Sequence, residues 1–163
     1  MAEHSRAATW DDVVRIARWL EEAGAEYALV GGYALFAHGL TRLTEDVDIL
    51  VEPSAANSRR WIAALARLPD GAARELETDP DVFAAGGLYA VRINDEITID
   101  VLPAAGGKRW QELKAHVVTV EIDGTAVRVL DLVGLLETKR GLRDKDRIDA
   151  GWIEHALEEL KRR

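Results

Sequence analysis

The chain has 163 residues, a net charge of −8, 48% hydrophobic and 31% charged residues, and no cysteine. This length and composition predict one domain, residues 1–163, with its own core, and they exclude a disordered or low-complexity chain. The missing cysteine excludes a disulfide scaffold, a thiol nucleophile and a zinc–thiolate site, and the acidic balance argues against sequence-independent nucleic-acid binding. No apolar stretch is long enough to span a bilayer and no signal peptide is evident, so we expect a soluble, cytoplasmic protein.

Hydrophobic periodicity and turn residues predict a mixture of helices and strands. Helices are expected at 9–23, 33–38, 54–68, 132–140 and 144–161. Strands are expected at 26–30, 46–52, 88–93, 97–102, 117–122 and 125–130, with two hairpins turning at 94–96 and 123–124. Residues 72–87 are expected to be mostly loop and 103–107 a break. Because the strands do not alternate strictly with helices, the pattern predicts an α+β fold, a mixed sheet with flanking helices.

Two polar residues are expected to cap helices. Thr9, with Asp12 three residues later, is placed to begin the first helix, and Asp131 is placed to begin the helix at 132–140. The tryptophans are expected mostly in the core. Trp110 alone has a polar context, which leaves stacking on a nucleobase as an alternative.

The stretch that carries chemistry begins with Gly31-Gly32, between a buried strand and a short helix. Two glycines let a ligand approach the backbone closely, and a helix N-terminus offers free N–H groups to a phosphate. An ordinary structural turn is the alternative reading. Asp46-Val47-Asp48 follows at the start of the next strand.

Residues i and i+2 of a strand share a face, so Asp46 and Asp48 are expected to point the same way. Asp100 interrupts another apolar strand, where a lone carboxylate is costly unless it is paired, hydrogen-bonded at a strand end or bound to metal. Adjacent carboxylates repel one another, and Mg²⁺ or Mn²⁺ is their natural partner. We therefore predict a three-carboxylate metal site on adjacent strands.

These residues resemble the nucleotidyltransferase superfamily of the DNA polymerase beta type, and in particular small bacterial proteins related to abortive-infection toxins of the AbiEii type. The pattern of those proteins is matched by nine residues: Gly31, Gly32, Ala34, His38, Gly39, Arg42, Thr44, Asp46 and Asp48. A second likeness, to a Lys…Arg-x-Lys-Asp…Asp segment, is carried by Lys139, Arg143, Lys145, Asp146 and Asp149. Many superfamily members have Ser where this chain has Gly32, so a hydroxyl is missing from the phosphate turn here.

The resemblance implies a metal-dependent enzyme that moves an NMP from an NTP to an acceptor hydroxyl and releases pyrophosphate. Asp46 and Asp48 would hold the metals, and Asp100 would hold the acceptor-side metal and help remove the proton. The nucleotide would be bound by Gly31, Gly32, Arg42, Thr44, Lys139 and Lys145.

Several of these residues have a second reading. Arg42 contacts phosphate or pairs with Glu45, and His38 is a structural residue at a helix end rather than a catalytic one. Asp146 and Asp149 either orient Lys145 and Arg42 or form ion pairs on the helix surface. The basic residues at 139–147 either bind phosphate or form a solvated helix face.

The resemblance does not fix the acceptor. RNA such as tRNA, in a toxin–antitoxin setting with a cognate antitoxin protein, is favoured. A small molecule such as an antibiotic, and a non-catalytic nucleotide-binding or partner-binding module on the same fold, are the alternatives.

Overall fold

The computed structural model describes residues 5–40, 44–139 and 144–162, with side chains of the last segment described from Arg147 onward. Six strands of this part of the chain form one sheet in the order β3-β4-β2-β1-β8-β7. Their bounds are β1 Tyr27–Val30, β2 Val47–Val51, β3 Val91–Asn94, β4 Thr98–Leu102, β7 Val117–Ile122 and β8 Thr125–Leu130. The pairs β1–β8 and β2–β4 are parallel and the other pairs are antiparallel, so the sheet is mixed, as predicted.

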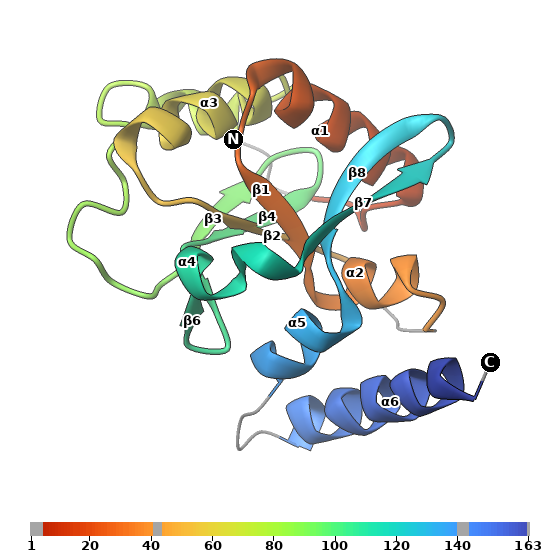
Figure 1. The fold of residues 1–163 in the computed structure, drawn as a ribbon. Coiled ribbons are helices and arrows are strands. Elements are labelled where there is room, and N and C mark those ends of the chain that lie inside the picture. The colour runs from red at the N-terminus through yellow and green to blue at the C-terminus, as the bar shows by residue number, and fades with distance from the viewer. Residues whose placement is uncertain (1–4, 41–43, 140–143, 163) are drawn as a thin grey trace.

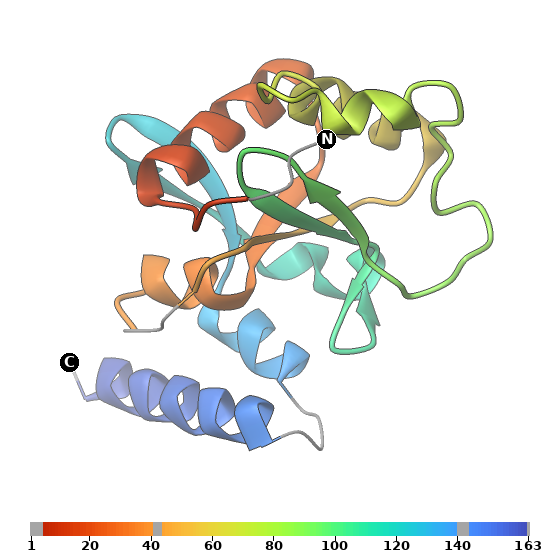
Figure 2. The same ribbon diagram turned by 180° about the vertical axis from the view of Figure 1, so that it is seen from behind.

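The helices lie on two sides of these strands. Helices α1 (Trp10–Ala23) and α3 (Ala55–Leu65) pack together on one side, and α2 (Gly31–Ala37), α5 (Leu132–Thr138) and α6 (Asp144–Lys161) lie on the other (Figures 1 and 2). Within the described ranges, no helix has both the length and the apolar character needed to cross a membrane. The predicted α+β class is confirmed.

Local sequence explains where the helices begin. The carboxylate of Asp12 accepts a hydrogen bond from the backbone N–H of Thr9 at 2.8 Å, and that of Asp131 accepts one from Gly134 N–H at 2.7 Å. Both predicted caps are therefore present, each satisfying a backbone donor that helical geometry leaves unpaired. The apolar face of α1, with Ile16 and Leu20 almost fully buried, packs into the core.

Some elements differ from the expected ones. Residues 88–90 do not join β3, because the β3–β4 register would place Tyr89 opposite Pro103, which has no N–H to donate. The expected break at 103–107 includes a short strand, β5 (Ala104–Ala105), which pairs with β6 (Lys108–Arg109) in a small hairpin. It is followed by α4 (Trp110–Leu113), and two 3₁₀ turns, η1 (Ala72–Leu76) and η2 (Lys114–His116), complete the fold.

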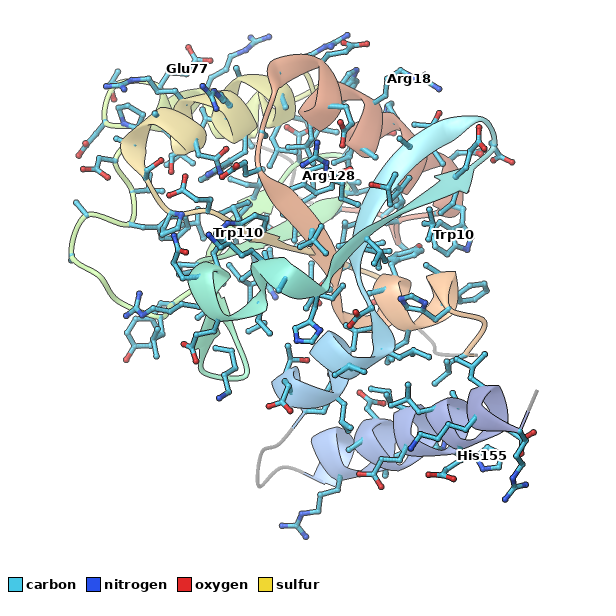
Figure 3. All side chains as sticks on the ribbon, in the orientation of Figure 1. Trp10, Arg18, Glu77, Trp110, Arg128 and His155 are labelled. Carbon is cyan, nitrogen blue, oxygen red and sulfur yellow. The ribbon has the colours of Figure 1, made fainter. Side chains whose placement is uncertain are left out.

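The tryptophans are divided between core and surface. Trp61 is fully buried and Trp110 is 6% exposed, but Trp152 on α6 is 49% exposed and so departs from the expectation that the tryptophans lie in the core. Figure 3 shows Trp110 inside the body of the protein, between α4 and the strands. Trp110 is therefore a core residue, and its alternative as a base-stacking surface is not supported.

Candidate functional site

The predicted site forms where β1 ends and β2 begins, next to the middle of β4. Asp48 lies beside Asp100 in the parallel β2–β4 register and opposite Val30 in the antiparallel β1–β2 register. Residues level with each other on neighbouring strands direct their side chains to the same face. The structure thus brings Asp48 and Asp100 together directly in front of Gly31, which follows Val30.

The environment of Asp48 disfavours its charged form. Burial is the largest cause, followed by the charge of Asp100, a hydrogen bond with Asp100 and the charge of Asp46, and together they raise the pKa of Asp48 to about 7. The charge of Lys139 acts in the opposite direction, lowering the same pKa. Because carboxylates this close cannot all ionise freely without a cation between them, Asp48 is partly protonated near neutral pH.

An arginine that the sequence analysis missed supplies a positive charge at this site. Arg92 on β3 lies opposite Asp100 and holds both carboxylate oxygens, with Nε 2.9 Å from Oδ1 and Nη2 3.1 Å from Oδ2. Its Nη2 also lies 3.7 Å from Asp46 Oδ2. The predicted hairpin did not reveal this contact: its turn at 94–96 is centred on Asp95 and would place Arg92 opposite Thr98, whereas the observed register, with Asn94 opposite Thr98, is centred on Glu96 and places Arg92 opposite Asp100.

The two glycines lie against side chains of this chain. Gly31 has a φ of +69°, which favours glycine, and a Cβ there would overlap Asp48 Oδ2. A Cβ at Gly32 would lie 2.6 Å from the Cβ of Thr44. The close approach expected at this turn is therefore made by Asp48 and Thr44, and the contact with phosphate stays a prediction.

Of the other predicted nucleotide-binding residues, Thr44 and Lys139 have described side chains. The hydroxyl of Thr44 donates to the backbone oxygen of Asp46 at 3.1 Å and so fixes the segment that leads into β2. Arg42 and the side chain of Lys145 lie outside the described residues, as do the side chains of Arg143 and Asp146.

Lys139, at the end of α5, is not on a solvated face. Its side chain is 12% exposed, and its Nζ lies 3.1 Å from Asp149 Oδ2, which is itself on a side chain only 2% exposed. The surface reading is therefore wrong for both residues. Asp149 pairs with Lys139, and Lys139 is close enough to Asp48 to influence its pKa.

His38, at the end of α2, has a structural contact. Its Nε2 lies 2.7 Å from the backbone oxygen of Leu130, which ties the end of α2 to the end of β8. This contact agrees with the structural reading of His38. A pocket of about 510 Å³ opens beside it, between the end of α2 and α6, and His155 and Trp152 line its other wall. Figure 3 shows His155 on α6, at the end of the molecule away from α1 and α3.

The carboxylates suit a divalent cation by chemistry, since Mg²⁺ and Mn²⁺ prefer oxygen ligands and Asp48 and Asp100 lie level on neighbouring strands. Among the side chains that the structure describes, however, no group of three or more His, Cys, Asp or Glu is arranged to hold a metal ion. Asp100 and Asp46 are instead in contact with Arg92. Three protein carboxylates around one metal thus remain a prediction.

Comparison with other proteins finds similarity in structure but not in sequence. No protein-family model and no curated protein matches the sequence. Among solved structures, the chain is similar to an antigenic nucleotidyltransferase-like protein from Paracoccidioides brasiliensis, with a TM-score of 0.51 and 16% sequence identity over 91% of this chain and 78% of that one. The order and direction of the strands, and the similarity to that structure over most of the chain, show that this protein has a nucleotidyltransferase-like fold.

Proposed function

We propose that this protein is a metal-dependent nucleotidyltransferase that moves an NMP from an NTP to an acceptor hydroxyl and releases pyrophosphate. The observation that carries the proposal is the pairing of Asp48 and Asp100 on β2 and β4, beside Gly31, in a chain with a nucleotidyltransferase-like fold. A fold alone hosts many activities, so the argument rests on this group of side chains.

The three aspartates would hold the metal. Asp48 and Asp100 lie on neighbouring strands and Asp46 precedes them at the start of β2. Since the described side chains offer no ready cluster of three ligands, triphosphate oxygens would complete the coordination. Bound Mg²⁺ or Mn²⁺ would supply charge neutralisation to the phosphoryl group.

The chain's own residues would do the rest. Asp100 would accept the proton of the acceptor hydroxyl. The hydroxyl oxygen would then form the bond to the α-phosphorus as the bond from that phosphorus to pyrophosphate breaks. Lys139 would offset the charge of the triphosphate, because its ammonium lies near Asp48 and is held by Asp149. We also assign nucleotide contacts to the backbone at Gly31 and Gly32 and to Arg42, Thr44 and Lys145.

The favoured acceptor is RNA such as tRNA, as in the toxin of a toxin–antitoxin pair with a cognate antitoxin protein. The basic residues between 139 and 147, in an otherwise acidic chain, support a phosphate-bearing acceptor over an antibiotic. We also propose that the protein acts in the cytoplasm, in keeping with a chain that has no cysteine.

Transfer of a radiolabelled α-phosphate tests the proposal. Each of the four NTPs, labelled at the α-phosphate, is incubated with the protein, Mg²⁺ or Mn²⁺ and total cellular RNA, and labelled RNA is measured on a denaturing gel. We expect transfer from at least one nucleotide, none with label at the γ-phosphate, and none with Asp48→Asn.

A second candidate is a non-catalytic nucleotide-binding module on the same fold. The contact of Arg92 with Asp100 and Asp46 favours it, since it already neutralises the carboxylates that a metal would use. Calorimetric titration and the transfer assay together separate the two functions: both proteins bind an NTP, but the module transfers no label to RNA, to protein or to an antibiotic. Absence of both binding and transfer contradicts both functions.

A further inference from the structure

The arginine at the site makes a two-pronged contact with one carboxylate. Arg92 is 58% exposed on β3, at the edge of the sheet, while Asp100 beneath it is 16% exposed. Its Nε and Nη2 each donate to a different oxygen of Asp100, at 2.9 and 3.1 Å, and Nη2 is 3.7 Å from Asp46 Oδ2. Paired charge-assisted bonds of this kind are stronger and more directional than a single contact.

The same oxygens would be ligands of a divalent cation. Both oxygens of Asp100 already accept hydrogen bonds from Arg92, and no group of three His, Cys, Asp or Glu among the described side chains is arranged to hold a metal. Asp48 lies level with Asp100 on β2, so releasing Arg92 with no replacement would leave neighbouring carboxylates without this counter-charge. A divalent cation could therefore take the place of the guanidinium as the counter-charge of these carboxylates.

From this arrangement we infer that Arg92 is a built-in counter-cation that competes with a divalent metal ion for Asp100 and Asp46. The metal binds when the guanidinium moves outward into solvent. Arg92 can make this movement without disturbing the core, because its side chain is exposed and stands on an edge strand. The inference rests on the proposed function only in taking the competing ligand to be a divalent cation.

Two substitutions of Arg92 distinguish direct competition for the carboxylate oxygens from a general effect of its positive charge on metal affinity. Arg92→Gln removes both the positive charge and the two-pronged contact. Arg92→Lys keeps the charge but loses the fork that binds both oxygens of Asp100. If Arg92 competes through its fork, both variants bind the metal more tightly than the parent does. If it acts only through long-range charge, Arg92→Lys binds like the parent.

The experiment is titration of the full chain with Mn²⁺ alone, with bound metal followed by electron paramagnetic resonance of the free ion. We expect about tenfold tighter binding for Arg92→Gln, and a smaller gain for Arg92→Lys. The control is Arg128→Gln, which removes another arginine, half-exposed, whose Nε lies 2.8 Å from a carboxylate, that of Glu21. It changes the net charge equally and should bind Mn²⁺ like the parent.

Thermal unfolding gives a readout that does not depend on activity. Without metal, Arg92→Gln should melt below the parent, and added Mn²⁺ should raise its melting temperature by more than it raises that of the parent. Equal Mn²⁺ affinity in the parent, Arg92→Lys and Arg92→Gln would overturn the competition and leave the metal site intact. No Mn²⁺ binding to the parent or either variant, with or without NTP, would overturn the metal site of the proposed function and the inference with it.

Discussion

Lys139 and Asp149 form a buried ion pair between α5 and α6, with Lys139 Nζ 3.1 Å from Asp149 Oδ2. The pair joins the last helix to the candidate site, because the charge of Lys139 also acts on Asp48. Breaking a buried pair by removing one partner leaves the other charge in a poorly solvated place, which is strongly destabilising.

Replacement of Lys139 by Met should therefore affect both stability and nucleotide binding. We expect a loss of about 3 kcal/mol in the free energy of unfolding, because Asp149 loses this partner. We expect NTP affinity to fall by about one to two decades, because a partly buried lysine–phosphate contact is worth roughly 1.5–3 kcal/mol. Denaturant unfolding and calorimetric titration measure the two effects.

The matched control is Lys161→Met, since Lys161 is 76% exposed and its Nζ is 3.8 Å from a Glu158 oxygen. It should change either quantity by less than about 0.5 kcal/mol. Equal effects of the two substitutions on NTP affinity would remove Lys139 from the nucleotide site.

Substitution of Asp48 by Asn should stabilise the metal-free protein at neutral and alkaline pH. The pKa of Asp48 is raised from 3.8 in the unfolded chain to about 7 in the folded protein. At pH values between these two, the folded state therefore binds more protons than the unfolded state. Stability of the parent therefore falls as pH rises from about 4 to about 7, by up to roughly 4 kcal/mol from this group. The amide introduced by Asp48→Asn does not titrate, so the variant should lose this dependence and melt higher at about pH 8.

Melting temperatures of the two proteins between about pH 4 and pH 9, in the presence of a chelator, test this expectation. Asp81→Asn, in a loop away from the sheet, serves as the control for loss of one negative charge. Parallel curves for the parent and Asp48→Asn would show that Asp48 ionises normally.

Gly32→Ala should be destabilising, because the new Cβ would meet the Cβ of Thr44 at 2.6 Å. The clash should cost about 1–3 kcal/mol, as overpacking does. Gly32→Ala combined with Thr44→Gly removes the atoms that clash, so it separates packing from phosphate approach. Because Thr44 is itself assigned to the nucleotide site, the double variant is compared with Thr44→Gly alone. If the turn binds phosphate, the double variant should bind NTP more weakly than Thr44→Gly at similar stability, and equal affinity would make the turn purely structural.

Asp12→Ala should destabilise the start of α1. Its carboxylate accepts hydrogen bonds from Thr9 and from Arg6 Nη2 at 2.8 Å, and hydrogen bonding to Arg6 is the main cause that lowers the pKa of Asp12 to about 2. Loss of the cap should cost about 1–2 kcal/mol at neutral pH. Because the pKa is lowered, this contribution is present above about pH 4 and is lost as pH falls towards 2, so the difference in unfolding free energy should shrink there.

Much of this protein could be predicted from local sequence. The hairpin at Asp123-Gly124, the caps at Thr9 and Asp131, and the strands leading to Asp48 and Asp100 follow from period-2 and period-3.6 patterns and turn chemistry, which act over a few residues. The same patterns placed Asp48 and Asp100 on separate apolar strands, and the mixed sheet followed from their irregular alternation with helices.

Tertiary structure decided which of these residues meet. The parallel register of β2 and β4 makes Asp48 and Asp100 neighbours, and the β3 register brings Arg92 onto Asp100. The packing of α6 on α5 buries Lys139 against Asp149. Strand order and helix packing depend on contacts between segments that are far apart in the sequence, and a pattern of a few neighbouring residues does not specify those contacts. The sequence by itself therefore determined the elements and the candidate carboxylates, and only the fold determined their counter-charges.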